Sequence, residues 1–155
     1  MPEVSFMYIE GIEGESNHKD HEGAIDVLQY DHQVSKEVDP LDCSKVRSDR
    51  HHGSVSVLKY MDKASPDLAK SLVQGATIPS IEIKWYRQPA DGDTEPEHYF
   101  TIKFSDVIVT SYRPSMSNAL DGGRSGHLEC MEFGYREVTW TSETGGTEFT
   151  DEVRT

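Results

Sequence analysis

Apolar and polar residues alternate along most of this chain, and an alternation with a period of two is typical of half-buried β-strands. Residues 4–9 (VSFMYI) and 25–30 (IDVLQY) show the pattern first, and their branched and aromatic side chains suit a pleated sheet. We expect further strands over residues 55–60, 81–86, 99–104, 107–112 and 128–140. The sequence therefore predicts a mainly β protein.

The alternation changes phase inside the last of these strands. Phe133 and Tyr135 share one face, whereas Val138 and Trp140 fall on the opposite face. One extra residue in a strand produces such a shift, so we expect a β-bulge near residues 134–137.

Residues 65–75 depart from the strand pattern and predict one short helix. Ser65 and Pro66 suit the N-cap and the first helical position, and Gly75 suits the end of the helix. A helix of about nine residues is not stable alone, so we expect it to lie on the sheet. Its apolar stripe consists of Leu68, Ala69, Leu72 and Val73.

We expect a single domain over residues 1–155, with two long loops over about 31–53 and about 113–126. Loops longer than about 12–15 residues in a compact domain are usually functional or disordered. The first of them carries charges of both signs among scattered apolar residues. Residues 87–98 are rich in turn-forming residues and predict a solvated hairpin tip.

The chain is acidic: its 155 residues include 15 Lys and Arg against 28 Asp and Glu, a net charge of −13. Such a charge repels phosphates, so we expect no nucleic-acid partner. No apolar run approaches the roughly 18 residues of a membrane span, so we expect no membrane insertion. The first residues lack the basic and apolar regions of a signal peptide, which predicts a cytoplasmic protein or one exported without a cleaved leader.

The charge is unevenly distributed along the chain. Residues 54–90 carry five bases against three acids. Residues 1–30 carry seven acids and one base, and residues 91–98 carry four acids and no base. Only the middle of the chain is therefore positive.

The histidines and cysteines do not form a recognisable metal site. His18 and His21 have a His-x-x-His spacing, but catalytic zinc needs three ligands on rigid elements, which favours a solvated turn. His51 and His52 are adjacent and point to opposite faces of an extended chain, which favours a turn or interface role. We expect the distant Cys43 and Cys130 to stay reduced, with Cys130 buried in a strand.

The sequence contains no motif for catalysis or for a cofactor. It has no P-loop, no G-x-G-x-x-G and no H-E-x-x-H, and the Ser125 region fails the G-x-S-x-G pattern. We therefore expect a protein that is not an enzyme and that needs no cofactor.

Several stretches, in order, resemble the Hcp family, the haemolysin-coregulated tube proteins of bacterial type VI secretion systems. The opening block is IEGIEGES over residues 9–16 and HEGAIDV over residues 21–27. The middle has Lys59, Asp62 and a helix that begins at Ser65. The last blocks are IKFSDVIV over residues 102–109 and MEFGYREV over residues 131–138. The likeness covers residues 4–142, almost the whole chain.

This resemblance implies a compact β-barrel of antiparallel strands with one short helix, assembled as a hexameric ring. Rings of this family stack into an inner tube that a contractile machine expels, and their lumen can hold secreted effector proteins. The implied partners are therefore further copies of this chain, effectors, and the tube tip and sheath of the machine. The protein would be cytoplasmic before firing and then secreted.

Two hypotheses follow for the assembly surfaces. Positive residues of the middle segment would meet acidic surface of the next subunit, since complementary charge sets the choice of partner. The candidates for this subunit interface are Lys59, Lys63 and Lys84. The loop over residues 31–53 would dock on the next ring, with candidates Asp39, Leu41, Asp42, Lys45 and Arg47.

Two alternatives stay open at the level of sequence. A tail-tube protein of a phage-like contractile particle would share the architecture. A carbohydrate-binding or hydrolytic β-barrel would need aromatic residues that converge on a pocket, for which Trp85, Tyr86 and Trp140 are the candidates.

Overall fold

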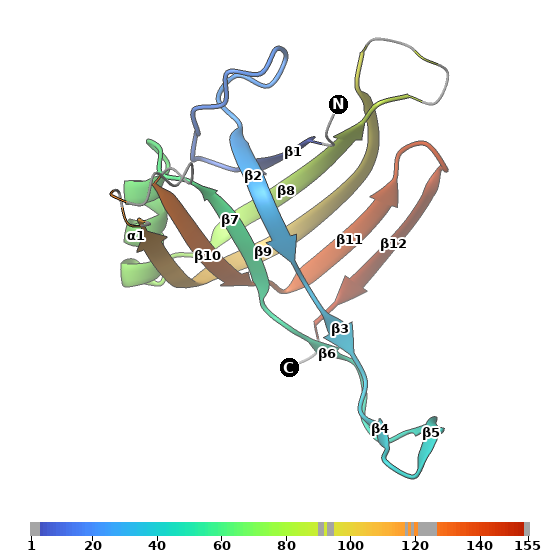
Figure 1. Cartoon of the computed structure of the whole chain (residues 1–155). Helices are drawn as coiled ribbons and strands as arrows, with labels where there is room; N and C mark the ends of the chain where they lie inside the picture. Colours follow the sequence, from blue (N-terminus) through green and yellow to red (C-terminus); the bar gives the residue numbers. More distant parts are fainter. Residues whose placement is uncertain are drawn as a thin grey trace.

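The computed structural model describes residues 4–89, 92, 95–116, 118, 120 and 127–153. These residues form one helix and a set of antiparallel strands (Figure 1). The elements are β1 (Val4–Ile9), β2 (Ile25–Asp31), β3 (Val34–Ser35), β4 (Val38–Asp39), β5 (Asp42–Val46), β6 (His51–His52), β7 (Val55–Tyr60), α1 (Ser65–Gln74), β8 (Ile78–Arg87), β9 (Glu97–Ser115), β10 (Leu128–Gly134), β11 (Glu137–Ser142) and β12 (Thr147–Glu152).

The strands close into a ring, called here the barrel, which confirms the mainly β prediction. Their order is β10-β7-β2-β1-β8-β9, and β9 pairs again with β10 to complete the circuit. Every pairing in the circuit is antiparallel. Strands β11 and β12 extend the sheet from β9. Closure leaves the strands of the ring no exposed edge, which in open sheets invites unwanted pairing.

Strand β9 runs around a corner of this ring. Its first half pairs with β11 and its second half with β10. The turn comes at Asp106, whose φ of 52° lies in the left-handed region, and Tyr135 and Arg136 separate β10 from β11 opposite it. The expectation of a single strand over residues 128–140 is therefore wrong. This segment forms two strands, β10 and β11, which both pair with β9. The irregularity in the β10–β9 register lies between Glu132 and Phe133.

The alternating apolar residues point into the ring and form its core. Met7, Val57, Ile83, Phe104 and Phe133 are fully or almost fully buried. Burying such a side chain contributes about 1.5–3 kcal/mol, so this interior is the main source of stability. Cys130 is only half-buried, less than we expected, and its Sγ lies 3.3 Å from the Ser56 hydroxyl.

The helix lies where the sequence predicts it and packs against the ring through Leu68, which is fully buried. Gly75 ends it in the left-handed conformation, and Pro66 occupies its first turn. The N-cap residue is Ala64 and not Ser65, and the Ser65 hydroxyl donates to Glu129 instead of capping the helix. Val73 is exposed, contrary to its place in the predicted apolar stripe.

The connections differ from expectation in one important respect. Residues 31–53 are not an irregular loop: β3 pairs with β6 and β4 pairs with β5, which makes an extended two-stranded hairpin. The hairpin tip predicted near residues 87–98 is confirmed by the pairing of Arg87 with Glu97. The loop expected over residues 113–126 begins only after β9 ends at Ser115, and most of it lies outside the described residues.

Two further observations complete the fold. Strand β12 was not predicted, and it adds an outer, largely exposed strand beside β11. Within the described residues, no helix combines the length and the apolar character needed to cross a lipid bilayer.

Candidate functional site

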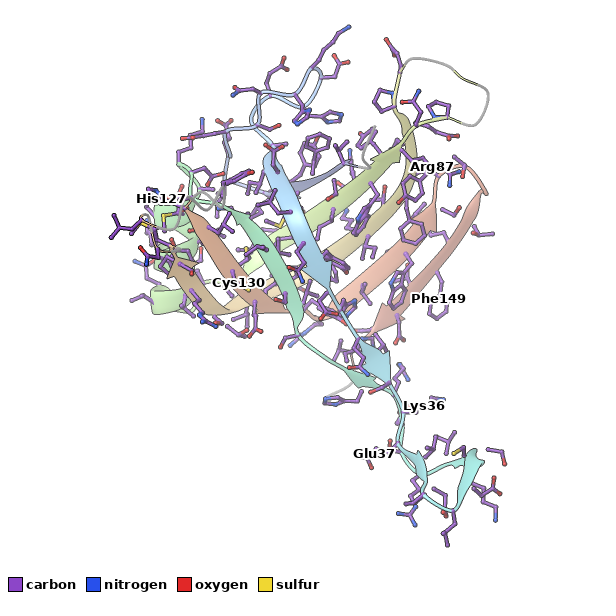
Figure 2. The ribbon with its side chains drawn as sticks, in the orientation of Figure 1. Lys36, Glu37, Arg87, His127, Cys130 and Phe149 are labelled. Atoms are coloured by element: carbon purple, nitrogen blue, oxygen red, sulfur yellow. The ribbon has the colours of Figure 1, made fainter. Side chains whose placement is uncertain are left out.

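The hairpin of residues 34–52, called here the projecting hairpin, extends away from the ring of strands (Figure 1). Its apolar residues are uncovered: Leu41 is 98% exposed and Val46 is 55% exposed. Val34 and Val38 are exposed as well, so the hairpin carries four apolar side chains that its own chain does not cover. Figure 2 shows Lys36 and Glu37 along its stem, well outside the body of the protein.

Five residues were predicted to contact a second hexameric ring, and all of them lie on the outer part of this hairpin. The Asp39 carboxylate lies 3.6 Å from the Arg47 guanidinium, across the β4–β5 pair. The Asp42 carboxylate accepts hydrogen bonds from the hydroxyl and the backbone N–H of Ser44, which lower its pKa. The tip is therefore an ordered, charged turn around an exposed leucine. The five residues are Asp39, Leu41, Asp42, Lys45 and Arg47.

Lys59 is not on the surface, so its candidacy for the subunit interface is wrong. Its ammonium group is 0% exposed and forms an ion pair with the equally buried Glu129. It also donates to Asp62 at 3.1 Å. Glu129 accepts further hydrogen bonds from Ser65 at 2.7 Å and from Tyr112 at 2.6 Å. We call these five residues the helix joint, because they tie the start of α1 to β7, β9 and β10.

The other two lysines remain on the outside. Lys63 is exposed and lies 3.5 Å from the Glu13 carboxylate, and the Lys84 ammonium lies 4.9 Å above the Tyr8 ring. Arg87, also in the positive segment, lies 3.4 Å from Glu97. Acidic residues that we expected to attract a neighbouring subunit therefore already face bases of their own chain.

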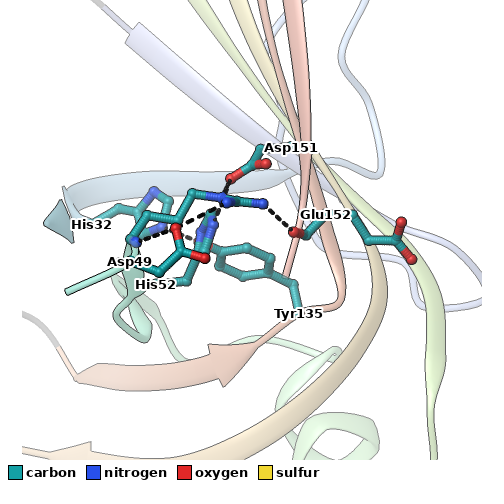
Figure 3. A network of polar contacts seen from close by, with 7 residues as sticks. His32, Asp49, His52, Tyr135, Asp151 and Glu152 are labelled. Carbon is teal, nitrogen blue, oxygen red and sulfur yellow. Dashed lines mark hydrogen bonds and ion pairs between the residues drawn. The ribbon is translucent and has the colours of Figure 1, made fainter. Parts of the chain in front are cut away.

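A second polar cluster joins the projecting hairpin to the barrel (Figure 3). The His52 ring lies between Tyr135, 2.7 Å from its Nδ1, and Asp151, 2.8 Å from its Nε2. The Nε2 of His32 lies 2.6 Å from the same Tyr135 hydroxyl. Arg50 donates through Nε to Asp151 at 2.5 Å. We call His32, Arg50, His52, Tyr135 and Asp151 the hairpin joint.

The environment of the hairpin joint shifts several pKa values. The hydrogen bond from Arg50 lowers the pKa of Asp151. Burial, and then the nearby His52, lower the pKa of His32. Burial raises the pKa of Tyr135. At neutral pH the joint therefore contains an ionised carboxylate, a protonated tyrosine and a neutral His32.

The histidines behave partly as predicted. His51 is exposed while the side chain of His52 is only 4% exposed, which confirms that they point to opposite faces. His21 is not simply solvated: its ring stacks on Phe6 with centroids 4.2 Å apart, and its Nδ1 lies 2.5 Å from the Tyr8 hydroxyl. Among the described residues, no three His, Cys, Asp or Glu side chains are placed to hold a metal ion.

The aromatic candidates for a carbohydrate pocket do not converge. Trp85 packs edge-on against Tyr30, whereas Tyr86 packs edge-on against Phe6 and His21, so the two rings belong to different clusters. Trp85 packs edge-on against Phe100, and Trp140 stacks on Phe149 at 6.1 Å on the outer strands. These contacts fit structural packing better than recognition of a sugar.

Phe149 belongs to the surfaces that sequence reasoning missed. It is 64% exposed and projects from β12, at the edge of the sheet (Figure 2). Tyr135 and Asp151 were missed as well, because their partners lie 83 and 101 residues away in the chain. The sequence signal for this cluster was the His51–His52 pair. Because neighbouring residues of a strand face opposite sides, one of the two histidines, His52, faces inward.

Comparisons with known proteins agree with this geometry. The sequence model of a family described as "Type VI secretion system effector, Hcp" matches residues 6–142. The "Major exported protein" of Pseudomonas aeruginosa is 36% identical over 143 residues, which are 91% of this chain and 81% of that protein. A mutant Hcp1 protein from the E. coli EAEC 042 pathovar has a similar structure, with a TM-score of 0.82, 30% identity and 98% of both chains covered. The secreted protein Hcp3 from Pseudomonas aeruginosa has a TM-score of 0.79 at 28% identity, over 99% of this chain and 100% of that one.

Proposed function

The chain belongs to the Hcp family of type VI secretion system proteins, and from this premise we propose that it forms hexameric rings that stack into the expelled inner tube. As a member of this family it is a secreted structural component of the secretion system. The role proposed for the chain is mechanical, and it requires no catalytic group and no cofactor.

The observation that carries the proposal is the projecting hairpin. It reaches beyond a closed barrel and presents an almost fully exposed Leu41 with charged residues around it. A second ring stacked on this side would cover the leucine and pair with the charges of Asp42, Lys45 and Arg47. Such a mixed contact suits a tube that must assemble and later come apart.

The contact within a ring would use the edge of the sheet. In the described chain, β12 pairs on one side with β11, and its other edge carries no strand. A neighbouring subunit could add its backbone there and cover Phe149, and rotation by one-sixth of a turn would close the ring. Lys63 and Lys84 would contribute charge complementarity, but Lys59 would not.

The proposed partners follow from a tube. Effector proteins would travel in the lumen, and the tip and sheath of the machine would contact the two ends and the outside. The chain would be cytoplasmic until the machine fires. These assignments extend what is known of the family to this chain.

The proposal is tested by the mass in solution, combined with negative-stain imaging. Six chains of 17.5 kDa give a ring of about 105 kDa. We expect that mass and ring-shaped particles with a central hole. A strict monomer at every concentration would contradict the proposal.

A further inference from the structure

The hydrogen bonds of the hairpin joint have a defined direction. The Asp151 carboxylate can only accept, so the His52 Nε2 must donate to it across 2.8 Å. The Nδ1 of a neutral His52 then accepts from the Tyr135 hydroxyl, and the Tyr135 oxygen accepts from the His32 Nε2. The chain His32 to Tyr135 to His52 to Asp151 is therefore satisfied with both imidazoles neutral.

The same chain can accommodate one extra proton. If His52 is protonated, its Nδ1–H donates to the Tyr135 oxygen, and the Tyr135 hydroxyl turns to donate to His32. His32 then needs only to carry its own proton on Nδ1 and not on Nε2. The ionised Asp151 faces the charged ring of His52, so this state has a counter-ion.

A second proton has no such accommodation. Both imidazolium rings would donate to one Tyr135 oxygen, 2.6 and 2.7 Å from their nitrogens, and the hydroxyl proton would lose both acceptors. Two positive rings would also repel each other across a single atom. His32 lies among aromatic rings, with the centroids of Phe104 and Trp140 5.7 and 6.4 Å away, so its charge would be poorly solvated.

Other charged and titratable groups face the joint from each packed element. On β2, Asp31 favours the charged form of His32, and the Tyr30 ring lies 6.4 Å from the ring of His32. On the hairpin, Arg50 pairs with Asp151 and with Asp49, so it partly neutralises the carboxylate that faces His52. His52 nevertheless contacts the Asp151 carboxylate directly, whereas the Nε2 of His32 contacts the neutral Tyr135 hydroxyl.

We propose that the hairpin joint accepts at most one proton beyond those of its two neutral imidazoles, and that a second added proton, on His32, releases the projecting hairpin from the barrel. The release separates His32 and His52 from Tyr135 and restores water to both rings. It acts within a single chain, so the joint itself does not depend on ring formation. Its consequence, control of ring stacking by pH, rests on the proposed function.

Hydrogen exchange of the full chain tests this inference as a function of pH. The reporters are backbone amides of the hairpin: Arg47 donates to Glu37 at 2.7 Å and Gly53 donates to Gln33 at 2.8 Å. A two-stranded hairpin without the support of a larger sheet is at best marginally stable, so release from the barrel should open these hydrogen bonds to exchange. After correction for the intrinsic pH dependence of exchange, we expect constant protection at neutral pH. Below the ordinary His pKa of 6.5, protection should fall about tenfold per pH unit, as one linked proton requires. Amides of α1 serve as the internal reference.

Matched variants separate the joint from a general effect of acid. His32→Gln keeps an N–H donor for Tyr135 but cannot become charged, so its hairpin protection should stay flat through the acid range. His51→Gln removes the exposed neighbouring histidine and should leave the wild-type profile unchanged. Tyr135→Phe should lower hairpin protection at every pH, with protection of α1 retained.

A flat wild-type profile, a transition that persists in His32→Gln, or one that His51→Gln abolishes would overturn the proposal. Sedimentation of the same samples distinguishes this failure from that of the proposed function. Loss of rings at neutral pH would contradict the assembly, whereas the exchange profile reports the joint in any oligomeric state.

Discussion

The helix joint and the hairpin joint both tie an appended element to the barrel with opposite charges, but they differ in burial and in chemistry. Lys59 and Glu129 are 0% exposed, and the helix joint contains no histidine. His52 and Asp151 are 4% and 14% exposed, and two imidazoles depend on one hydroxyl. The same kind of contact therefore makes a permanent connection in one place and a breakable one in the other.

The largest effect should come from breaking the helix joint. Glu129→Gln removes the negative charge opposite the buried Lys59 ammonium, which keeps Asp62 as its ionised partner and a backbone carbonyl as a neutral one. Loss of one partner of a buried ion pair costs about 3–5 kcal/mol. Urea unfolding should show a decrease of this size, whereas Glu132→Gln, on the exposed face of the same strand, should change stability little. A loss below about 1 kcal/mol for Glu129→Gln would show that the pair is not needed.

Breaking the hairpin joint should have a smaller and local effect. Tyr135→Phe leaves nitrogens of His32 and His52 without their shared partner, which costs about 1–3 kcal/mol. Because the hairpin contributes little to the core, this loss should appear as faster amide exchange in residues 34–52. Tyr60→Phe, at a half-exposed tyrosine on β7, is the control. Equal loss of protection in α1 would mean that the joint supports the whole fold.

The pH dependence of stability sharpens the contrast further. Burial and His52 lower the pKa of His32 in the folded protein, so the unfolded chain binds its proton more readily. The stability that neutral His32 contributes is thus complete above pH 6.5 and is lost as the pH falls toward the lowered pKa. The slope from this one group cannot exceed about 1.4 kcal/mol per pH unit. Urea midpoints should fall less between pH 7.5 and 5.5 in His32→Gln than in the wild type; equal decreases would contradict this assignment.

Surface charge should have the smallest effect. The double variant Lys63→Glu with Lys84→Glu should weaken ring formation by no more than about 1 kcal/mol per charge, because both side chains are exposed or half-exposed. Sedimentation at low and high salt measures the loss of ring formation, with Lys70→Glu on the helix as control.

Screening by salt should affect the assembly of tubes more than the assembly of rings, since each chain has a net charge of −13. Tubes that are insensitive to salt would contradict this part of the account.

Much of the barrel was predictable because burial alternates with the pleat. Strands β1, β2 and β7 and the helix lie where the pattern places them. The alternation also indicated that Lys59 is buried, because Lys59 lies on the same inward face of its strand as Val55 and Val57. A lysine is normally assigned to solvent, so the burial of its charge could be recognised only with Glu129 beside it.

The rest depended on contacts that sequence does not display. Strand β12 (TEFTDE) is mostly exposed and lacks an apolar alternation. The projecting hairpin has short strand pairs separated by polar turns, so its residues look like a loop. Arg50 and Asp151 lie 101 residues apart, and only the closed barrel brings them together.

The central claim, that the projecting hairpin joins one ring to the next, is tested most directly by deleting residues 37–49. Ser35 pairs with His51, so the deletion leaves Lys36 and Arg50 as the connection between them and keeps His32, His52, Tyr135 and Asp151 of the hairpin joint. Negative-stain imaging with sedimentation should show intact hexamers of about 96 kDa and no tubes, under conditions in which the full chain forms tubes. Tubes that persist would contradict the claim, and loss of the hexamers would place the hairpin within the ring.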